Sequence, residues 1–244
     1  MDIITYMWFL LAIFACMIFS LVASAKVHSA YAKYAKVMCR SGATGYDTAT
    51  RLMRANGVTG IAVGRISGNL TDHYHPSKQI VNLSESTYGN SSVAAVAVAA
   101  HEIGHVMQKQ EGYLFYRVRT ALVPVVNFGS WLAMPLVLIG LLLDLFAFST
   151  NPDVGFYVAM VGVLLYGSAF LFALVTLPVE LDASRRAGKM LVAEGILTQD
   201  ELPGAKKVLS AAALTYLASL LTSLVYFLRF LIYVLAIFGR RRRD

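Results

Sequence analysis

Residues 154–177 read VGFYVAMVGVLLYGSAFLFALVTL and contain no charged side chain. A helix of this length can cross the hydrocarbon core of a bilayer, which needs about 20 mainly apolar residues. The composition of the whole chain agrees, because 57% of its 244 residues are hydrophobic and only 14% are charged. A soluble domain carries roughly a quarter of its residues charged. The composition therefore excludes an ordinary soluble globule and a disordered chain, and it predicts an α-helical multi-pass membrane protein.

Three other runs have the same character. The four predicted spans are residues 3–25, 121–143, 154–177 and 209–238. The first run exceeds the roughly 7–15 apolar residues of a signal peptide, so we interpret it as a retained span. Asn127 lies within the second run, where a polar side chain faces a bundle interior or hydrogen-bonds between helices. The last run contains Arg229 as its one charge and is long enough for its beginning to stand outside the bilayer.

The polar segments 26–120 and 178–208 lie on either side of the second and third spans. A short turn at 149–153 makes these spans a hairpin, which returns the chain to the side it left. Both segments therefore join into one domain. The chain has 21 basic and 14 acidic residues, an excess that in a membrane protein indicates a cytoplasmic domain rather than nucleic-acid binding. The side of the membrane on which the basic tail, residues 239–244, lies stays open, because four simple spans would place this tail on the side opposite the two polar segments.

The first polar segment contains VAAVAVAAHEIGHVMQKQ at residues 93–110. This stretch is rich in alanine and lacks proline, so it predicts a helix, with Asn90, Ser91 or Ser92 as its N-terminal cap. The first turns are small and apolar on all sides, which predicts a buried helix.

His101 and His105 are four residues apart and share a face of this predicted helix, so two imidazole nitrogens can bind one metal ion. Glu102 stands beside them, where it can take a proton from water activated by zinc. The order His-Glu-x-x-His is the arrangement found in zinc peptidases. We therefore predict one Zn²⁺ per chain on this helix, with Glu102 as general base.

Two histidines leave a catalytic zinc one protein ligand short. Pro178 suits a first helical turn, so Glu180 and Asp182 are expected at a helix start, and Glu180 is the best third ligand. The alternative is a carboxylate that merely favours a helix N-terminus. Asp182 points about 200° away from Glu180. It would pair with Arg185 or Arg186, or orient a ligand histidine. The two arginines would stabilise an oxyanion or anchor the chain at the membrane.

The chain resembles the YugP-type membrane zinc metallopeptidases, which are related in style to the HtpX-like enzymes. The resemblance runs through nearly the whole chain, in GNLTDHYHP (68–76), VNLSESTY (81–88), AAHEIGHVMQ (99–108), PVVNFGS (124–130), PVELDASRRA (178–187) and AALTYLA (212–218). It implies zinc on His101, His105 and Glu180, with Glu102 as general base. The HtpX-like pattern has an aspartate where this chain has Ser184. The resemblance therefore does not imply which residue of this chain hydrogen-bonds to a ligand histidine.

Short β-type runs alternate with turn residues over 58–88, which predicts a small antiparallel element with a turn at residues 75–78. Such an element either pairs with an extended substrate or simply covers the helix. His73 and His75 alternate on one strand face. Together with Asp72 they would make a competing metal site, although a hydrogen-bonded pair of histidines is the commoner arrangement.

These features predict a multi-pass membrane protein with a small α+β zincin-type domain, acting as a gluzincin endopeptidase. The expected location is the plasma membrane of a prokaryote, with the site facing the cytoplasm. The expected partners are the bilayer and a polypeptide substrate, and the oligomeric state stays open. A metal transporter would need more ionisable residues in its spans than Arg229 and Asp144. A zinc-stabilised scaffold would have four protein ligands and no need of Glu102. Cys16 and Cys39 are too few for a disulfide framework.

Overall fold

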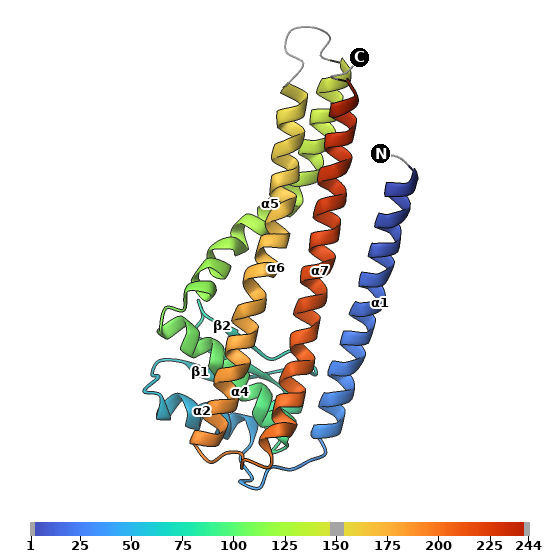
Figure 1. The fold of residues 1–244 in the computed structure, drawn as a ribbon. Helices are drawn as coiled ribbons and strands as arrows, with labels where there is room; N and C mark the ends of the chain where they lie inside the picture. The colour runs from blue at the N-terminus through green and yellow to red at the C-terminus, as the bar shows by residue number, and fades with distance from the viewer. Residues whose placement is uncertain (1–2, 147–153, 242–244) are drawn as a thin grey trace. The chain divides into compact units, whose positions relative to one another are not determined.

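The computed structural model describes residues 3–146 and 154–241, which are mostly helical (Figure 1). The predicted turn at 149–153 and the end of the basic tail lie outside the described residues. The elements, in chain order, are α1 (Ile3–Tyr34), α2 (Gly45–Ala55), β1 (Ala62–Ile66), β2 (His73–His75), β3 (Ile80–Ser84), α3 (Glu85–Tyr88), α4 (Val93–Gln110), α5 (Leu114–Phe146), α6 (Val154–Ala193) and α7 (Leu202–Arg241).

Four helices, α1, α5, α6 and α7, are long and apolar enough to cross a membrane. Each contains one of the predicted spans, so the helical character of those runs is confirmed. The chain divides into two compact units. The first, here called the helical unit, comprises Met1–Leu21, Val118–Thr176 and Tyr216–Asp244. The second, here called the sheet unit, comprises Val22–Arg117 and Leu177–Thr215.

In the helical unit, α5 and α6 approach closely where both carry small residues. A Cβ added to Gly140 would lie 2.5 Å from the backbone of Gly155, and one added to Gly162 would lie 2.6 Å from the carbonyl of Ala133. Small residues let apolar helices pack backbone against backbone, which stabilises association in lipid. Asn127 does not take part in the packing of α5 against α6. Its side chain is exposed on α5 and is not turned inward as the sequence predicted.

The predicted helix start at Pro178 is wrong, because α6 continues through this residue from Val154 to Ala193. Proline in a helix interior removes one hydrogen bond, which usually costs about 3 kcal/mol. In long apolar helices neighbouring groups re-satisfy the freed carbonyl, so the helix tolerates it. Glu180 and Asp182 therefore lie inside a helix. This position contradicts the alternative that the two carboxylates merely favour a helix N-terminus.

The sheet unit contains a three-stranded sheet with the order β1-β3-β2. β2 pairs antiparallel with β3, as predicted, and residues 76–79 form the turn between them. β1 pairs parallel with β3, so the prediction of a wholly antiparallel element is wrong there. The reason is the strand order, because β3 lies between β1 and β2. The alternation of residues within a short stretch of sequence does not determine this order. β2 is consequently an edge strand.

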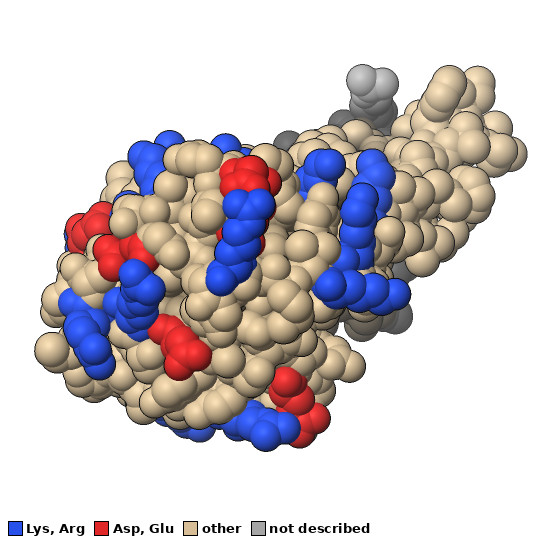
Figure 2. All heavy atoms as spheres, turned by 90° about the horizontal axis from the view of Figure 1, so that it is seen from below, with Lys and Arg blue, Asp and Glu red and all other residues tan. Residues whose placement is uncertain are grey.

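The core of the sheet unit forms around α4. Val96, Ile103 and Val106 of this helix have no exposed surface and belong to one cluster with Leu83 of β3 and Leu191 of α6. Charged side chains of both signs are spread over the face seen in Figure 2. Some are ion-paired at the surface of the sheet unit, for example Arg40 with Asp200.

Candidate metal centre

Helix α4 carries both histidines of the predicted motif. Ser92 caps its first turn, because its hydroxyl oxygen accepts a hydrogen bond from the Ala95 backbone N–H at 3.3 Å. This is one of the three predicted caps. His101 and His105 then lie one turn apart, with their rings edge to face and the ring centroids 4.8 Å apart.

Helix α6 crosses α4 at Gly104, the residue directly before His105. A Cβ at this position would lie 2.6 Å from the carbonyl oxygen of Ala183, so only glycine allows the two backbones to approach this closely. Glu180 lies about one turn before Ala183 on α6. The close crossing therefore brings the Glu180 carboxylate to the two imidazoles.

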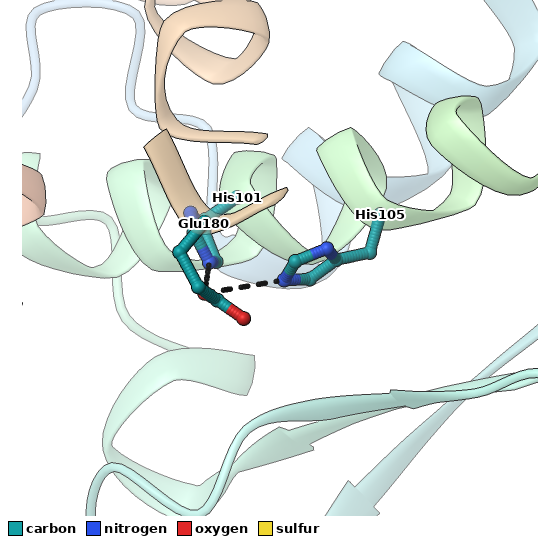
Figure 3. A group of neighbouring side chains, drawn as sticks. All are labelled: His101, His105 and Glu180. Atoms are coloured by element: carbon teal, nitrogen blue, oxygen red, sulfur yellow. Dashed lines mark hydrogen bonds and ion pairs between the residues drawn. The ribbon is translucent and has the colours of Figure 1, made fainter. Parts of the chain in front are cut away.

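The three side chains converge, as Figure 3 shows. Glu180 Oε2 lies 3.2 Å from His101 Nε2 and 3.5 Å from His105 Nε2. The ligand atoms of all three residues lie within 4.8 Å of one another. The Glu180 side chain is only 2% exposed.

The separations of the two imidazole nitrogens from Glu180 fit zinc. Two ligands bound roughly 2.0–2.1 Å from one tetrahedral zinc ion lie about 3.3 Å apart, which matches both separations from Glu180. The donor set of two imidazole nitrogens and one carboxylate oxygen is also one that catalytic zinc sites use. The residues present therefore fit the metal.

His105 is oriented by Gln108, which lies one turn later on α4 and has no exposed surface. The Gln108 amide nitrogen donates to the Val179 carbonyl at 2.8 Å and to Asp182 Oδ2 at 2.9 Å. Its amide oxygen is thereby left to accept from His105 Nδ1, 3.0 Å away. With the proton on Nδ1, His105 directs the lone pair of Nε2 toward Glu180 and the metal position.

His101 has a different partner. Its Nδ1 lies 3.1 Å from the hydroxyl oxygen of Ser184, which can accept the Nδ1 proton and leave Nε2 free to bind metal. This serine occupies the position at which the HtpX-like pattern has aspartate. A neutral hydroxyl therefore stands in this chain where that pattern has a carboxylate.

Asp182 pairs with both arginines, as one of the two predicted roles required, and its link to a histidine is indirect, through Gln108. It accepts hydrogen bonds from Arg185 at 2.8 Å and from Arg186 at 2.6 Å, and it reaches His105 through Gln108. Arg186 also donates to Glu111 at 2.6 Å. The two arginines thus hold carboxylates. Sequence reasoning missed Gln108, although its place three residues after His105 was a usable signal.

Glu102 is buried beside this cluster, with 7% of its surface exposed. Burial raises the pKa of Glu102 to about 7, and the negative charges of Glu180 and Asp72 act in the same direction. His101 and a hydrogen bond from the Tyr74 backbone oppose this rise. The Tyr74 contact places the edge strand β2 next to the carboxyl group.

The two histidines of β2, His73 and His75, are held by local hydrogen bonds. His73 Nδ1 lies 2.9 Å from the Thr71 carbonyl oxygen, and its Nε2 lies 3.1 Å from the Asn82 side chain. His75 Nδ1 accepts from the Lys78 backbone N–H at 3.3 Å. Within residues 3–146 and 154–241, the metal-binding side chains that converge are His101, His105 and Glu180, so the competing site on the strand is not formed.

The chain belongs to a family of zinc metallopeptidases. The family model described as "Putative neutral zinc metallopeptidase" matches residues 8–235. The curated protein "Putative membrane protease YugP" of Bacillus subtilis (strain 168) is 43% identical over 224 residues, which cover 92% of this chain and 95% of that protein. The family resemblance inferred from the sequence is thereby confirmed. No solved structure matches the chain.

Proposed function

We propose that the protein is a gluzincin-type membrane endopeptidase that holds one Zn²⁺ on His101, His105 and Glu180. The observation that carries this proposal is the convergence of these three donors beside the buried Glu102. Three converging donors, counted over the part of the chain that the structure describes, favour a catalytic site over a structural one, since structural zinc sites have four protein ligands.

Zinc, when bound, supplies Lewis acidity that polarises a peptide carbonyl and makes water a stronger nucleophile. The protein supplies the proton transfers. Glu102 accepts a proton from the water that attacks the carbonyl carbon, and it returns this proton to the amine nitrogen as the C–N bond breaks. Gln108 and Ser184 keep the protons of the two ligand histidines on Nδ1, so that each Nε2 stays available for the metal.

We further propose that β2 binds the substrate backbone. β2 is an edge strand of the described sheet, and its central residue, Tyr74, contacts Glu102. An extended polypeptide that pairs with this edge would present its backbone beside the general base. Because backbone groups make such contacts, this binding tolerates many sequences, as a protease acting on several membrane or membrane-adjacent polypeptides would need.

The chemistry is tested by comparing wild-type protein with Glu102→Gln, using an unstructured peptide substrate and metal analysis. We expect Glu102→Gln to retain about one zinc per chain while hydrolysis falls by at least about 10²-fold, because the residue moves protons and is not a ligand. Glu85→Gln is the matched control, since Glu85 is an exposed residue paired with Arg65. Hydrolysis at a near wild-type rate in Glu102→Gln would contradict the mechanism.

The location we propose is the plasma membrane of a prokaryote, with several spans and the site facing the cytoplasm. The four long apolar helices and the basic excess of the polar segments support it. Cysteine labels at Ser77 and Gln199 should both react from the cytoplasmic side, and a label at Asn151 should react from the other side. Labels at Ser77 and Gln199 that react from opposite sides would refute this topology.

A further inference from the structure

Arg229 has no role in the proposed metal centre, yet it is the one charged residue in the apolar run 209–238. In lipid an unpaired guanidinium is costly, and ionisable residues within spans commonly bind a ligand or a counter-ion. The Arg229 guanidinium lies 5.7 Å from the ring centroid of Tyr6. Across the described ranges, no carboxylate pairs with it.

A groove of about 560 Å³ surrounds Arg229, and all of its lining belongs to the helical unit. Each of the four long helices contributes to the lining: Tyr6 comes from α1, Ser130 from α5, Tyr166 from α6, and Tyr226, Arg229 and Tyr233 from α7. The three α7 residues are spaced three and four apart, so they form one stripe on that helix.

The hydroxyl groups of the tyrosines in this groove have no hydrogen-bond partner in the part of the chain that the structure describes, residues 3–146 and 154–241. The groove contains four such phenol hydroxyls, those of Tyr6, Tyr166, Tyr226 and Tyr233. One guanidinium and four phenols offer only donors and weak acceptors, with no acidic residue in the lining. A ligand with an anionic, oxygen-rich group would satisfy them together.

We propose that this groove binds an anionic phospholipid, with its phosphate on Arg229 and the tyrosine hydroxyls as additional donors. Guanidinium binds phosphate with two parallel hydrogen bonds, which favours this head group. The groove opens on the surface of helices that are long and apolar enough to cross a membrane, and Tyr226 and Tyr233 are 38% and 47% exposed there. A lipid of the surrounding bilayer reaches such a surface directly, and its acyl chains can lie along the apolar helices while its phosphate binds in the groove.

The test uses the full chain, purified with zinc, stripped of lipid and placed in detergent. Phosphatidylglycerol and phosphatidylcholine with the same acyl chains are titrated in separate experiments, and lipids bound per chain are counted by native mass spectrometry. We expect one phosphatidylglycerol per chain bound more tightly than phosphatidylcholine, and binding at least about tenfold weaker in Arg229→Gln. Arg65→Gln controls for loss of an arginine outside the groove.

A second variant keeps the test decisive if Arg229→Gln does not fold, as judged by helix content and zinc content. Tyr226→Phe combined with Tyr233→Phe retains both rings and removes two donors, and it should also weaken phosphatidylglycerol binding. Tyr157→Phe, which changes an exposed tyrosine of α6 outside the groove, should leave binding unchanged.

Three results would overturn the proposal. The first is undiminished phosphatidylglycerol binding in folded Arg229→Gln, or in the double tyrosine variant. The second is equal affinity of the wild type for phosphatidylcholine. The third is complete displacement of phosphatidylglycerol by millimolar inorganic phosphate, which would show a site for a free anion rather than for a lipid.

Discussion

Replacing Gly104 by alanine tests whether the close crossing of α4 and α6 builds the metal centre. The added Cβ would lie 2.6 Å from the Ala183 carbonyl oxygen and 3.0 Å from its Cα, whereas ordinary contact begins at 3.4 Å. The two backbones must therefore separate by about 0.8 Å at this point. Ligand distances in a zinc site tolerate only about 0.2 Å of variation.

Two effects of Gly104→Ala on stability have opposite signs. Alanine favours a helix over glycine by about 1 kcal/mol, which alone would stabilise the protein. Forcing an extra methyl group against a backbone costs typically about 1–3 kcal/mol. We expect the second effect to dominate, since the obstructing atoms belong to a helix backbone and cannot rotate away. The separation should also weaken zinc binding by at least about tenfold, as loss of an orienting contact does.

The assay combines thermal unfolding in detergent with a competition titration of zinc against a chelator. Gly188→Ala is the matched control, because Gly188 lies inside α6, the helix that crosses α4, and an added Cβ would make only an ordinary contact, 3.6 Å from Leu202. It should raise stability slightly and leave zinc affinity unchanged. Gly104→Ala protein that is as stable as wild type and binds zinc equally well would refute the reasoning.

Further predictions concern single side chains. Glu180→Ala should lose zinc nearly completely, whereas Asp182→Ala should retain measurable zinc; metal analysis showing the reverse would mean that Asp182 is the ligand. Gln108→Leu should lower zinc affinity by about 10–100-fold without changing the ligands, because His105 loses its orienting acceptor, and an unchanged chelator titration would exclude that role. Hydrogen bonds from the Thr44 side chain and backbone lower the pKa of Asp47, so metal-free protein should lose stability as pH falls below about 4. Unfolding midpoints between pH 6 and pH 3 should show this loss in the wild type and less of it in Asp47→Asn.

The features that sequence predicted well depend on short-range patterns. Helical spans follow from runs of apolar residues, and the cap at Ser92 follows from a hydroxyl residue before an alanine-rich stretch. The pair His101 and His105 shares a face because a helix repeats every 3.6 residues. Glu180 was predicted as their neighbour because the predicted hairpin returns the chain to the same side.

The features that sequence did not predict depend on contacts between distant segments. The place of β3 between β1 and β2 is a matter of strand order, which residue alternation leaves undetermined. Pro178 followed the usual preference for a first turn, but the surrounding apolar helix overrode it. The spacing of Gln108 from His105 was a signal in the sequence, but the partners that fix its amide, Val179 and Asp182, lie more than 70 positions away and only the structure shows them.

His101 and Glu180 are 79 positions apart, and the chain between them makes all of α5 and most of α6. Synthesis runs from the N-terminus, so the two histidines exist well before the carboxylate that joins them. A nascent chain that ends before Glu180 therefore holds an incomplete ligand set. Once complete, a bound ion would act as a cross-link that closes this long loop and removes conformational entropy from the unfolded chain. Chelation should then loosen the association of α4 with α6 as well as stop catalysis.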